Sequence, residues 1–432
     1  MFKFNRAPVA GAALLCALAM PAAHATNGYF SHGYGLQAKG MGGAAIAVTQ
    51  DAFGGANNPA GGAWVGSRLD LGIDWFSPQR SASRTGSNLP TPGGTVAAGA
   101  DFSTASDSTS FFIPEFGYNR MLGSDKSVGL TVYGNGGMNT DYAGGTTMCG
   151  NALCGQGRLG VDLAQLIVAP TFSMKLDADH SVGVALLLGY QRFKVEGLQA
   201  FEALTGSPGS VTNNGYDSST GVGLRLGYLG RVGTDLQFGA SYTPKMHMSK
   251  FDKYKGLFAE QGGFDIPAHY AVGLAWRPAS DWQLALDLER IQYRGIASVG
   301  NPSSNQAPLG ADNGPGFGWQ DISVVKVGVQ WRMSPALTLR AGYNHGGNPV
   351  KADNVTFNII APGVVQNHVT LGGTLAIGPG SDLTLACMHA MKQSVSGSSM
   401  YNSPSLFGPG NGGTETIQMH QNSLGIGWSL RF

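Results

Sequence analysis

Apolar and polar residues alternate along the chain from about residue 63 to its end. The pattern is clearest at 281–289, and it recurs at 325–333 and 369–377. In the first of these runs, large apolar side chains occupy one parity and mostly polar ones the other: Trp282, Leu284, Leu286 and Leu288 against Gln283, Ala285, Asp287 and Glu289. Successive side chains of a strand point to opposite faces, so this period predicts β-strands with one apolar and one polar face.

The alternating runs are long for strands. They extend over about ten residues, whereas strands of soluble proteins average about five or six. About ten tilted residues span a bilayer. After residue 25, no apolar run approaches the ~18 residues of a transmembrane helix. A sheet in lipid must close on itself, because lipid cannot satisfy the backbone groups of an open edge. The sequence therefore predicts an all-β fold, a transmembrane antiparallel β-barrel.

The spacing of turns predicts the number of strands. Short polar turns are expected at 123–126, 177–180, 231–235, 278–281, 333–335 and 378–382. Long Gly/Ser/Asn-rich loops are expected at 78–109, 138–157, 197–216, 245–263, 297–317, 346–362 and 395–415, with helix-like pieces at 198–204 and 254–261. Short periplasmic turns and long external loops are usual in bacterial outer-membrane barrels. Together they join about 14 strands.

The segment that precedes the first strand has a different character. Residues 26–60 are rich in Gly and Ala, show no sustained period, and carry only Lys39 and Asp51 as charged residues. Glycine costs backbone entropy on folding and brings no side chain to a core, so such a segment is expected to be ordered only when something encloses it. We therefore predict that residues 26–62 form a hatch in the lumen of a barrel made by residues 63–432.

Both ends of the chain carry targeting features. Residues 1–25 contain Lys3 and Arg6, then an apolar run at 9–20 and a small-x-small pattern at 23–25, which predicts a signal peptide. The last alternating run ends on Phe432 at the apolar parity, and this resembles the C-terminal signal read by the outer-membrane assembly machinery. We expect a bacterial outer-membrane protein that contacts this machinery, membrane lipid and lipopolysaccharide.

Composition narrows the choice of partners. Only 12% of the residues are charged and the formal net charge is +1, so no electrostatic surface for nucleic acid is expected. The low charge and the hatch also disfavour a general diffusion porin. The sequence contains no ATP or nicotinamide motif, and we expect no cofactor.

The cysteines fit an exported protein. Cys149 and Cys154 lie close together in a predicted loop, where a disulfide is expected in an oxidising compartment. The alternative is a metal site, but no flanking His or third Cys supports one. Cys387 is expected to be an unpaired apolar residue.

The start of the mature chain resembles the FadL/TodX family of outer-membrane proteins. The resemblance rests on TNGYFSHGYG at 26–35, KGMGGAA at 39–45 and NNPA at 57–60. It implies a monomeric 14-stranded barrel with an N-terminal hatch, and uptake of long-chain fatty acids or other hydrophobic compounds, including aromatic hydrocarbons. The hatch motif of the family matches Asn58, Pro59 and Ala60. Tyr29 and Phe30 would lie near an internal ligand pocket, with simple aromatic packing as the alternative.

The family also has an inward kink in its third strand that opens the barrel sideways. The corresponding run here, 128–138, contains Gly134, Gly136 and Gly137, which lack a Cβ and permit a bulge. The resemblance thus implies a lateral opening at these glycines. The alternative is that they only end the strand.

Apolar loop residues indicate where a solute would first bind. Leaving water stabilises an apolar molecule by ~25 cal/mol per Å², so a greasy groove on the loops would collect it. We expect this groove at Leu198, Phe201, Leu204, Leu257 and Phe258, although these residues could instead pack loop helices onto the barrel. By parity, Arg225, Lys326, Arg332 and Arg340 face the lumen near Asp287 and Glu289. They are possible partners of a substrate carboxylate or members of lumenal salt bridges.

These observations favour a channel and not an enzyme. We predict passive uptake of fatty acids or other hydrophobic compounds by loop capture, lumenal binding and lateral release. The alternative is an outer-membrane barrel with an adhesive, structural or lipid-hydrolysing role. The scattered histidines form no hydrolase motif, which disfavours hydrolysis.

Overall fold

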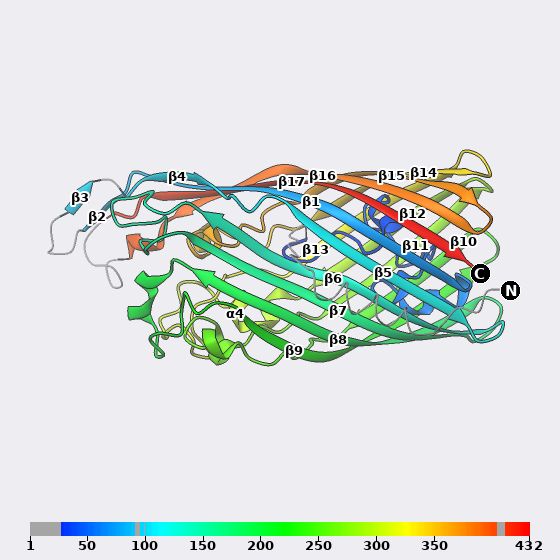
Figure 1. The fold of residues 1–432 in the computed structure, drawn as a ribbon, viewed down its shortest axis with the longest axis horizontal. Coiled ribbons are helices and arrows are strands. Elements are labelled where there is room, and N and C mark those ends of the chain that lie inside the picture. The colour runs from blue at the N-terminus through cyan, green and yellow to red at the C-terminus, as the bar shows by residue number, and fades with distance from the viewer. Residues whose placement is uncertain (1–26, 91–95, 99, 404–410) are drawn as a thin grey trace.

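Fourteen long antiparallel strands form the wall of a barrel in the computed structural model, which describes residues 27–90, 96–98, 100–403 and 411–432 (Figure 1). The predicted signal peptide lies outside these residues. The wall strands are β1 (Arg68–Thr85), β5 (Phe111–Met121), β6 (Lys126–Tyr142), β7 (Leu159–Lys175), β8 (His180–Glu196), β9 (Asp217–Val232), β10 (Leu236–Thr243), β11 (His269–Ala279), β12 (Trp282–Ile291), β13 (Ile322–Arg332), β14 (Leu337–Gly346), β15 (Asn367–Gly378), β16 (Ser381–Ser398) and β17 (Thr414–Arg431).

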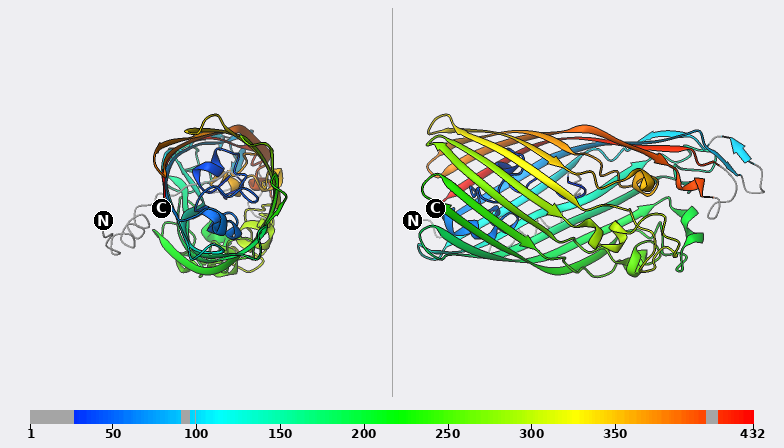
Figure 2. Two further views of the ribbon diagram at one scale, coloured as in Figure 1. Left: turned by 90° about the vertical axis from the view of Figure 1, so that its right-hand side faces the viewer. Right: turned by 180° about the vertical axis from the view of Figure 1, so that it is seen from behind.

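Each wall strand pairs with the next along the chain, and β1 pairs with β17 from Arg68↔Arg431 to Thr85↔Thr414. This closure confirms the predicted 14-stranded barrel. The six short turns lie at one end and the seven long loops at the other (Figure 2). A short strand, β4 (Phe102–Ala105), pairs with β1 at the loop end, and β2 (Asn88–Pro90) pairs with β3 (Val96–Ala98) in the same loop.

Some strands are longer than the sequence pattern indicates. Loops were expected to begin at 78, 138 and 395, but β1 continues to Thr85, β6 to Tyr142 and β16 to Ser398. The predicted loop boundaries at these places are wrong. Backbone pairing of β17 with both β1 and β16 continues to Thr414, so the strands extend after their apolar outer faces end.

The two faces of the wall differ as a lipid-embedded barrel requires. In β12, Leu284, Leu286 and Leu288 are exposed on the outer face, whereas Gln283 and Asp287 are buried. Aromatic side chains gather on the outer face near the turn end, where Trp282 and Trp331 stack with ring centroids 5.5 Å apart. Aromatic girdles of this kind mark the interface between hydrocarbon and head groups. Among the residues that the structure describes, no helix is long and apolar enough to cross a membrane.

The N-terminal segment, described from Asn27 to Gly66, lies inside the barrel (Figure 2). It contains α2 (Leu36–Lys39), η1 (Phe53–Gly55) and η2 (Pro59–Trp64), and most of its residues are buried. Wall glycines let its backbone approach closely. A Cβ on Gly183 would lie 2.3 Å from the carbonyl of Pro59, and one on Gly342 would lie 2.0 Å from the amide nitrogen of Gly42. Larger residues at these positions would push the segment off the wall.

Short helices lie among the long loops at the opposite end from the turns. They are η3 (Gln199–Leu204), η4 (Asp252–Tyr254), α3 (Ala259–Gly262), η5 (Tyr293–Gly295), α4 (Ala297–Gly300), η6 (Ala352–Asn354), η7 (Phe357–Ile359) and η8 (Met400–Asn402). The helical piece expected at 198–204 is η3. The piece expected at 254–261 is interrupted, because Glu260 and Gln261 have positive φ of 57° and 54°. The Gln261 amide donates to the carbonyl of Gly310 in a neighbouring loop instead.

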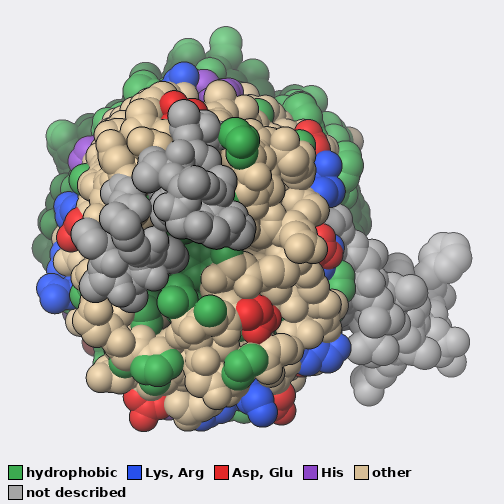
Figure 3. Space-filling model, turned by 90° about the vertical axis from the view of Figure 1, so that its left-hand side faces the viewer, with side chains coloured by type: hydrophobic (Ala, Val, Ile, Leu, Met, Phe, Trp, Pro, Cys, Tyr) green, Lys and Arg blue, Asp and Glu red, His purple; other side chains and the backbone are tan. Residues whose placement is uncertain are grey.

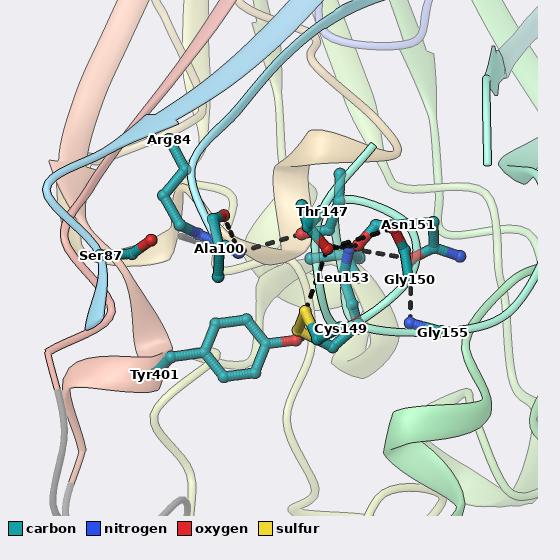
Figure 4. Close-up of a disulfide and its surroundings, with 12 residues drawn as sticks. Arg84, Ser87, Ala100, Thr147, Cys149, Gly150, Asn151, Leu153, Gly155 and Tyr401 are labelled. Atoms are coloured by element: carbon teal, nitrogen blue, oxygen red, sulfur yellow. Dashed lines mark hydrogen bonds between the residues drawn. A yellow bond between two sulfur atoms is a disulfide. The ribbon is translucent and has the colours of Figure 1, made fainter. Parts of the chain in front are cut away.

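A disulfide joins Cys149 to Cys154 in the loop between β6 and β7 (Figure 4). The small loop it closes is held by two residues from other parts of the chain. Arg84 donates from Nη2 to the carbonyl of Ala152 at 3.0 Å, and the Tyr401 hydroxyl donates to the carbonyl of Leu153 at 3.0 Å. Arg84 also forms a buried ion pair with Glu415 of β17. Cys387, on β16, is exposed and unbonded.

A charge placed on the outer face tests whether that face meets lipid. We expect Leu286→Arg, in the middle of β12, to destabilise the inserted barrel by about 2–4 kcal/mol, because an arginine at the bilayer midplane is poorly solvated. Leu122→Arg, in the turn between β5 and β6, is the control and should cost at most about 1 kcal/mol. Urea unfolding in lipid vesicles measures both. Equal destabilisation by the two variants would contradict the membrane-facing assignment.

Candidate functional site

A cavity of about 40 Å³ lies among the loops. Its lining comes from five loops and from the ends of β7 and β8: Leu153, Val161, Phe193, Leu198, Phe201, Leu257, Phe258, Ser298, Leu309, Pro315, Gly316, Phe317, Phe357 and Ile360. Four of the five residues expected to form a capture groove are among them. The fifth, Leu204, lines an adjacent cavity with Phe357 and Met400. The alternation pattern gives no signal for the contributions of the three loops that follow β6, β12 and β14, since these loops have no period.

Almost all of the side chains that line the loop cavity are apolar. Ser298 supplies its one polar side chain, and no charged residue lines it. Aromatic rings form one wall, where Phe258 lies 4.6 Å from Phe193 and 5.0 Å from Phe264 between ring centroids. Figure 3 shows the loop end, where hydrophobic side chains form the floor of a hollow. Such a cavity suits an apolar molecule and gives a sugar or an ion no partner.

Aromatic residues continue from this cavity to the tip of the N-terminal segment. Phe317 lines the cavity, and its ring centroid lies 6.3 Å from that of Trp319. The Trp319 centroid lies 5.9 Å from that of Tyr29. Tyr29 also lies 5.2 Å from Tyr293, and both rings are fully buried. Burial raises the pKa of Tyr29 well above its usual value, so the phenol stays neutral. The structure thus places the predicted aromatic tip, Tyr29 and Phe30, at the inner end of an apolar path.

The wall is interrupted beside this tip. The pairing of β5 with β6 ends at Phe116↔Val132, although β5 continues along β1 to Phe111 and β6 continues along β7 to Tyr142. The register of β6 against β7 shifts between Gly134 and Gly136, so the strand bulges within its length and does not end there. Within the described part of the wall, β5 and β6 therefore do not pair with each other beyond Phe116↔Val132, and this gap is called the window below.

The N-terminal segment occupies the free edge of β6 at the window. Phe30 forms a bridge with Gly136, the Ser31 amide donates to the carbonyl of Asn135 at 3.3 Å, and the Gly137 amide donates to the carbonyl of Tyr29 at 3.2 Å. A Cβ on Gly136 would lie 2.0 Å from the carbonyl oxygen of Tyr29. Glycine at this position is therefore what allows the tip to pair with the bulged strand.

The hatch motif fixes the other end of the segment. Asn58 donates from Nδ2 to the carbonyls of Ile46 at 2.8 Å and of Tyr228 at 2.9 Å, while its Oδ1 accepts from the Ala60 amide at 3.1 Å. The carbonyl of Pro59 accepts from a serine of β7, and that of Ala60 from a serine of β8. The motif therefore caps η2 and fastens it to β7, β8 and β9.

A buried ion cluster provides a second attachment. Lys39 in α2 lies 3.0 Å from Asp74 of β1 and 3.1 Å from Glu115 of β5. Burial by itself would lower the pKa of Lys39, but the two carboxylates reverse this effect and raise the pKa above its usual value. Lys39 is consequently charged, and it is bound to both strands of the β1–β5 pair.

Three of the four predicted carboxylate partners are buried and engaged within the protein. Arg225 donates to Thr243 Oγ1 and to the carbonyls of Gly55 and Ala56 in the segment. Lys326 forms an ion pair with Glu289 at 2.8 Å. Arg340 donates to four side chains, those of Gln37, Gln50, Gln330 and Thr374. Arg332 is exposed at the end of β13. Lys326 is therefore a member of a lumenal salt bridge. Arg225 and Arg340 attach the N-terminal segment to the wall.

A closed barrel with an apolar outer band and an apolar internal path is a membrane transport channel in its architecture. The chain belongs to the family described as outer membrane protein transport protein (OMPP1/FadL/TodX), which matches residues 13–403. This is a family of outer-membrane channels for hydrophobic compounds and not of enzymes. The family, the outer-membrane location and the non-enzymatic role predicted from the sequence are confirmed.

Solved structures of similar proteins have the same fold. The toluene transporter TodX of Pseudomonas putida is 17% identical, with a TM-score of 0.66 over 93% of this chain and 99% of that chain. A FadL homologue of Pseudomonas aeruginosa is 13% identical, with a TM-score of 0.69 over 94% and 100%. The toluene transporter TbuX of Ralstonia pickettii is 17% identical, with a TM-score of 0.62 over 93% and 99%. No curated protein sequence matches the chain.

The hatch motif can be tested by removing its attachments. We expect Asn58→Ala to weaken the local stability of residues 45–62 by about 2–4 kcal/mol, because it deletes a cap and the donor to the carbonyls of Ile46 and Tyr228. Hydrogen exchange of these amides, followed by mass spectrometry, should accelerate by about 30-fold or more. Asn57→Ala is the matched control, since Asn57 bonds only to Tyr34 and Phe53 within the segment. Unchanged exchange in Asn58→Ala would contradict the anchoring role.

Proposed function

We propose that this protein is a passive channel through which hydrophobic compounds enter the outer membrane from outside. One observation carries the proposal: apolar side chains lead without interruption from the loop cavity to the window in β6. The loop cavity shares Phe317 with the aromatic path, and the path ends at Tyr29 and Phe30, which pair with the bulged strand. Movement along it is downhill, so no energy source is required.

Capture is the first step of this proposal. An apolar solute leaves water for the loop cavity and gains ~25 cal/mol for each Å² that it buries. No charged residue of the described chain lines the cavity, so the cavity selects the apolar part of the solute and not a charged head group. The similar structures include toluene transporters and a FadL homologue, and we propose fatty acids or other hydrophobic compounds, including aromatic hydrocarbons, as the substrates.

Release into the membrane is the last step, with residues 26–62 as the hatch. The two attachments, at Lys39 and at Asn58–Ala60, hold its body to the wall. The tip is joined to β6 by the bridge of Phe30 with Gly136 and by the two flanking backbone bonds. We propose that the tip alone withdraws and that solute then leaves sideways between β5 and β6. The channel acts as a monomer, inserted by the barrel assembly machinery and surrounded by lipid and lipopolysaccharide.

The loop cavity can be tested by making one wall polar. We expect Leu257→Gln to raise the half-saturation concentration for uptake of a hydrophobic substrate by about tenfold, because an amide in an apolar cavity lacks partners. The maximal rate should change little, since later steps do not involve Leu257. The control is Leu371→Ala, on the outer face of β15. A lower maximal rate with unchanged half-saturation would contradict a capture role.

Lateral release can be tested at the bulge. We expect Gly136→Val to reduce uptake by about tenfold or more, because its side chain displaces the Tyr29 carbonyl and fills the window. Gly134→Val should act in the same direction. Gly373→Val is the matched control, since a Cβ on that strand glycine meets nothing closer than 3.8 Å. Normal uptake by inserted Gly136→Val would contradict lateral release.

The substrate class is best identified by native mass spectrometry of the protein after mild detergent extraction. Retained hydrophobic ligands would support the proposed uptake function and would name the compounds. A ligand-free protein that also fails to accumulate any hydrophobic compound in vesicles would contradict it.

A further inference from the structure

Arg80 is a buried cation for which the protein supplies no anion. It lies on β1 at the same parity as Asp74 and Phe76, so its side chain enters the lumen, and the residue is 5% exposed. Nη2 donates to the carbonyl of Ser108, and the guanidinium lies 5.9 Å from the centroid of the Phe111 ring. The Nε atom is buried without a hydrogen-bond partner.

The other buried cations of the wall and segment show how unusual this is. Arg68, Arg84, Lys39 and Lys326 each form an ion pair with a carboxylate, and Arg225 and Arg340 use every guanidinium nitrogen in hydrogen bonds. Arg80 forms no ion pair with any described residue. The remaining residues of the sequence, 1–26, 91–95, 99 and 404–410, contain no Asp or Glu.

A small cavity adjoins this guanidinium. Its volume is about 10 Å³, and it is lined by Arg80, Met138, Asn139, Trp319, Ala361, Pro362, Gly363 and Met419. Asn139 also contributes a buried polar atom without a partner, Oδ1. The cavity is thus apolar except at two side chains, and one of these carries the unpaired positive charge.

The cavity lies beside the proposed path of the solute. Trp319 belongs both to this cavity and to the aromatic path, where it lies 5.9 Å from Tyr29. Ala361 directly follows Ile360, which lines the loop cavity. The cavity at Arg80 therefore borders the proposed path where that path reaches Trp319.

We propose that Arg80 binds the carboxylate of an apolar acid during its passage, so that the lumen selects carboxylates over neutral compounds of the same shape. This inference rests on the proposed function and deepens it. A buried charge without a partner is costly, and an incoming carboxylate would supply the missing anion. Hydrogen bonds between ions are about twice as strong as neutral ones. The apolar part of the acid contacts Met138, Trp319 and Met419.

The test compares a carboxylate with its neutral ester. Octanoate and methyl octanoate are each allowed to displace tritium-labelled octanoate from the protein in lipid nanodiscs, with empty nanodiscs as background. We expect the wild type to bind octanoate about tenfold more tightly than the ester. Arg80→Met keeps the apolar stem and removes the charge, so the ratio of the two affinities should fall to about one. Arg80→Lys should give an intermediate ratio, because lysine keeps the charge without the planar fork.

The controls separate charge at this site from charge elsewhere and from folding. Arg120→Gln removes an exposed cation of β5 and should leave the ratio unchanged. Heat-dependent gel mobility shows whether each variant is a folded barrel. If Arg80→Met does not fold, Arg80→Lys provides the test. A wild-type ratio in either Arg80 variant would overturn the proposal. So would displacement of the label by acetate at octanoate concentrations, which would indicate a site for small anions. If the wild type binds neither octanoate nor its ester, the proposed uptake function fails as well.

Discussion

Pairing of backbone groups across the β1–β17 seam is the constraint on which the rest of the structure depends. Lipid offers no hydrogen bonds, so every outward edge must be closed, and here the first and last strands close it over eighteen residue pairs from Arg68↔Arg431 to Thr85↔Thr414. Once the wall is closed, its inner face encloses polar groups away from lipid. Segments without their own core, such as the glycine-rich N-terminus, can then be ordered by bonding to that face.

The window between β5 and β6 is the departure from this rule, and it is where we propose that solute leaves the barrel. Above Phe116↔Val132 the edge of β6 would be unpaired, but Tyr29, Phe30 and Ser31 pair with it from inside. These backbone groups are therefore satisfied by the tip and not by β5. A wall that is sealed by a separate segment can open without unfolding any strand.

The interior charges have distinct tasks. Lys39 with Asp74 and Glu115, and Lys326 with Glu289, are compensated pairs, and they hold elements in place. Arg225 and Arg340 bond to the N-terminal segment and so belong to its attachment. Arg80 alone among these lumenal cations lacks both a carboxylate and a partner for Nε. Its position beside Trp319 is what distinguishes a binding role from a structural one.

The sequence by itself determined the barrel, its strand number and its family, because the alternation at 281–289, 325–333 and 369–377, the spacing of the turns and the motifs at 26–60 are all local features of the chain. It also identified the motif at Asn58–Ala60 and four of the residues that line the loop cavity. The alternation does not show that β1 continues past residue 78, so it places Arg80 in a loop. The parity of Arg80 nevertheless continues that of Asp74 and Phe76. The sequence could not show which lumenal cations are compensated. Ion pairs, the pairing of Phe30 with Gly136 and the joining of five loops around one cavity link residues far apart in the chain. Only the closed tertiary structure brings them together.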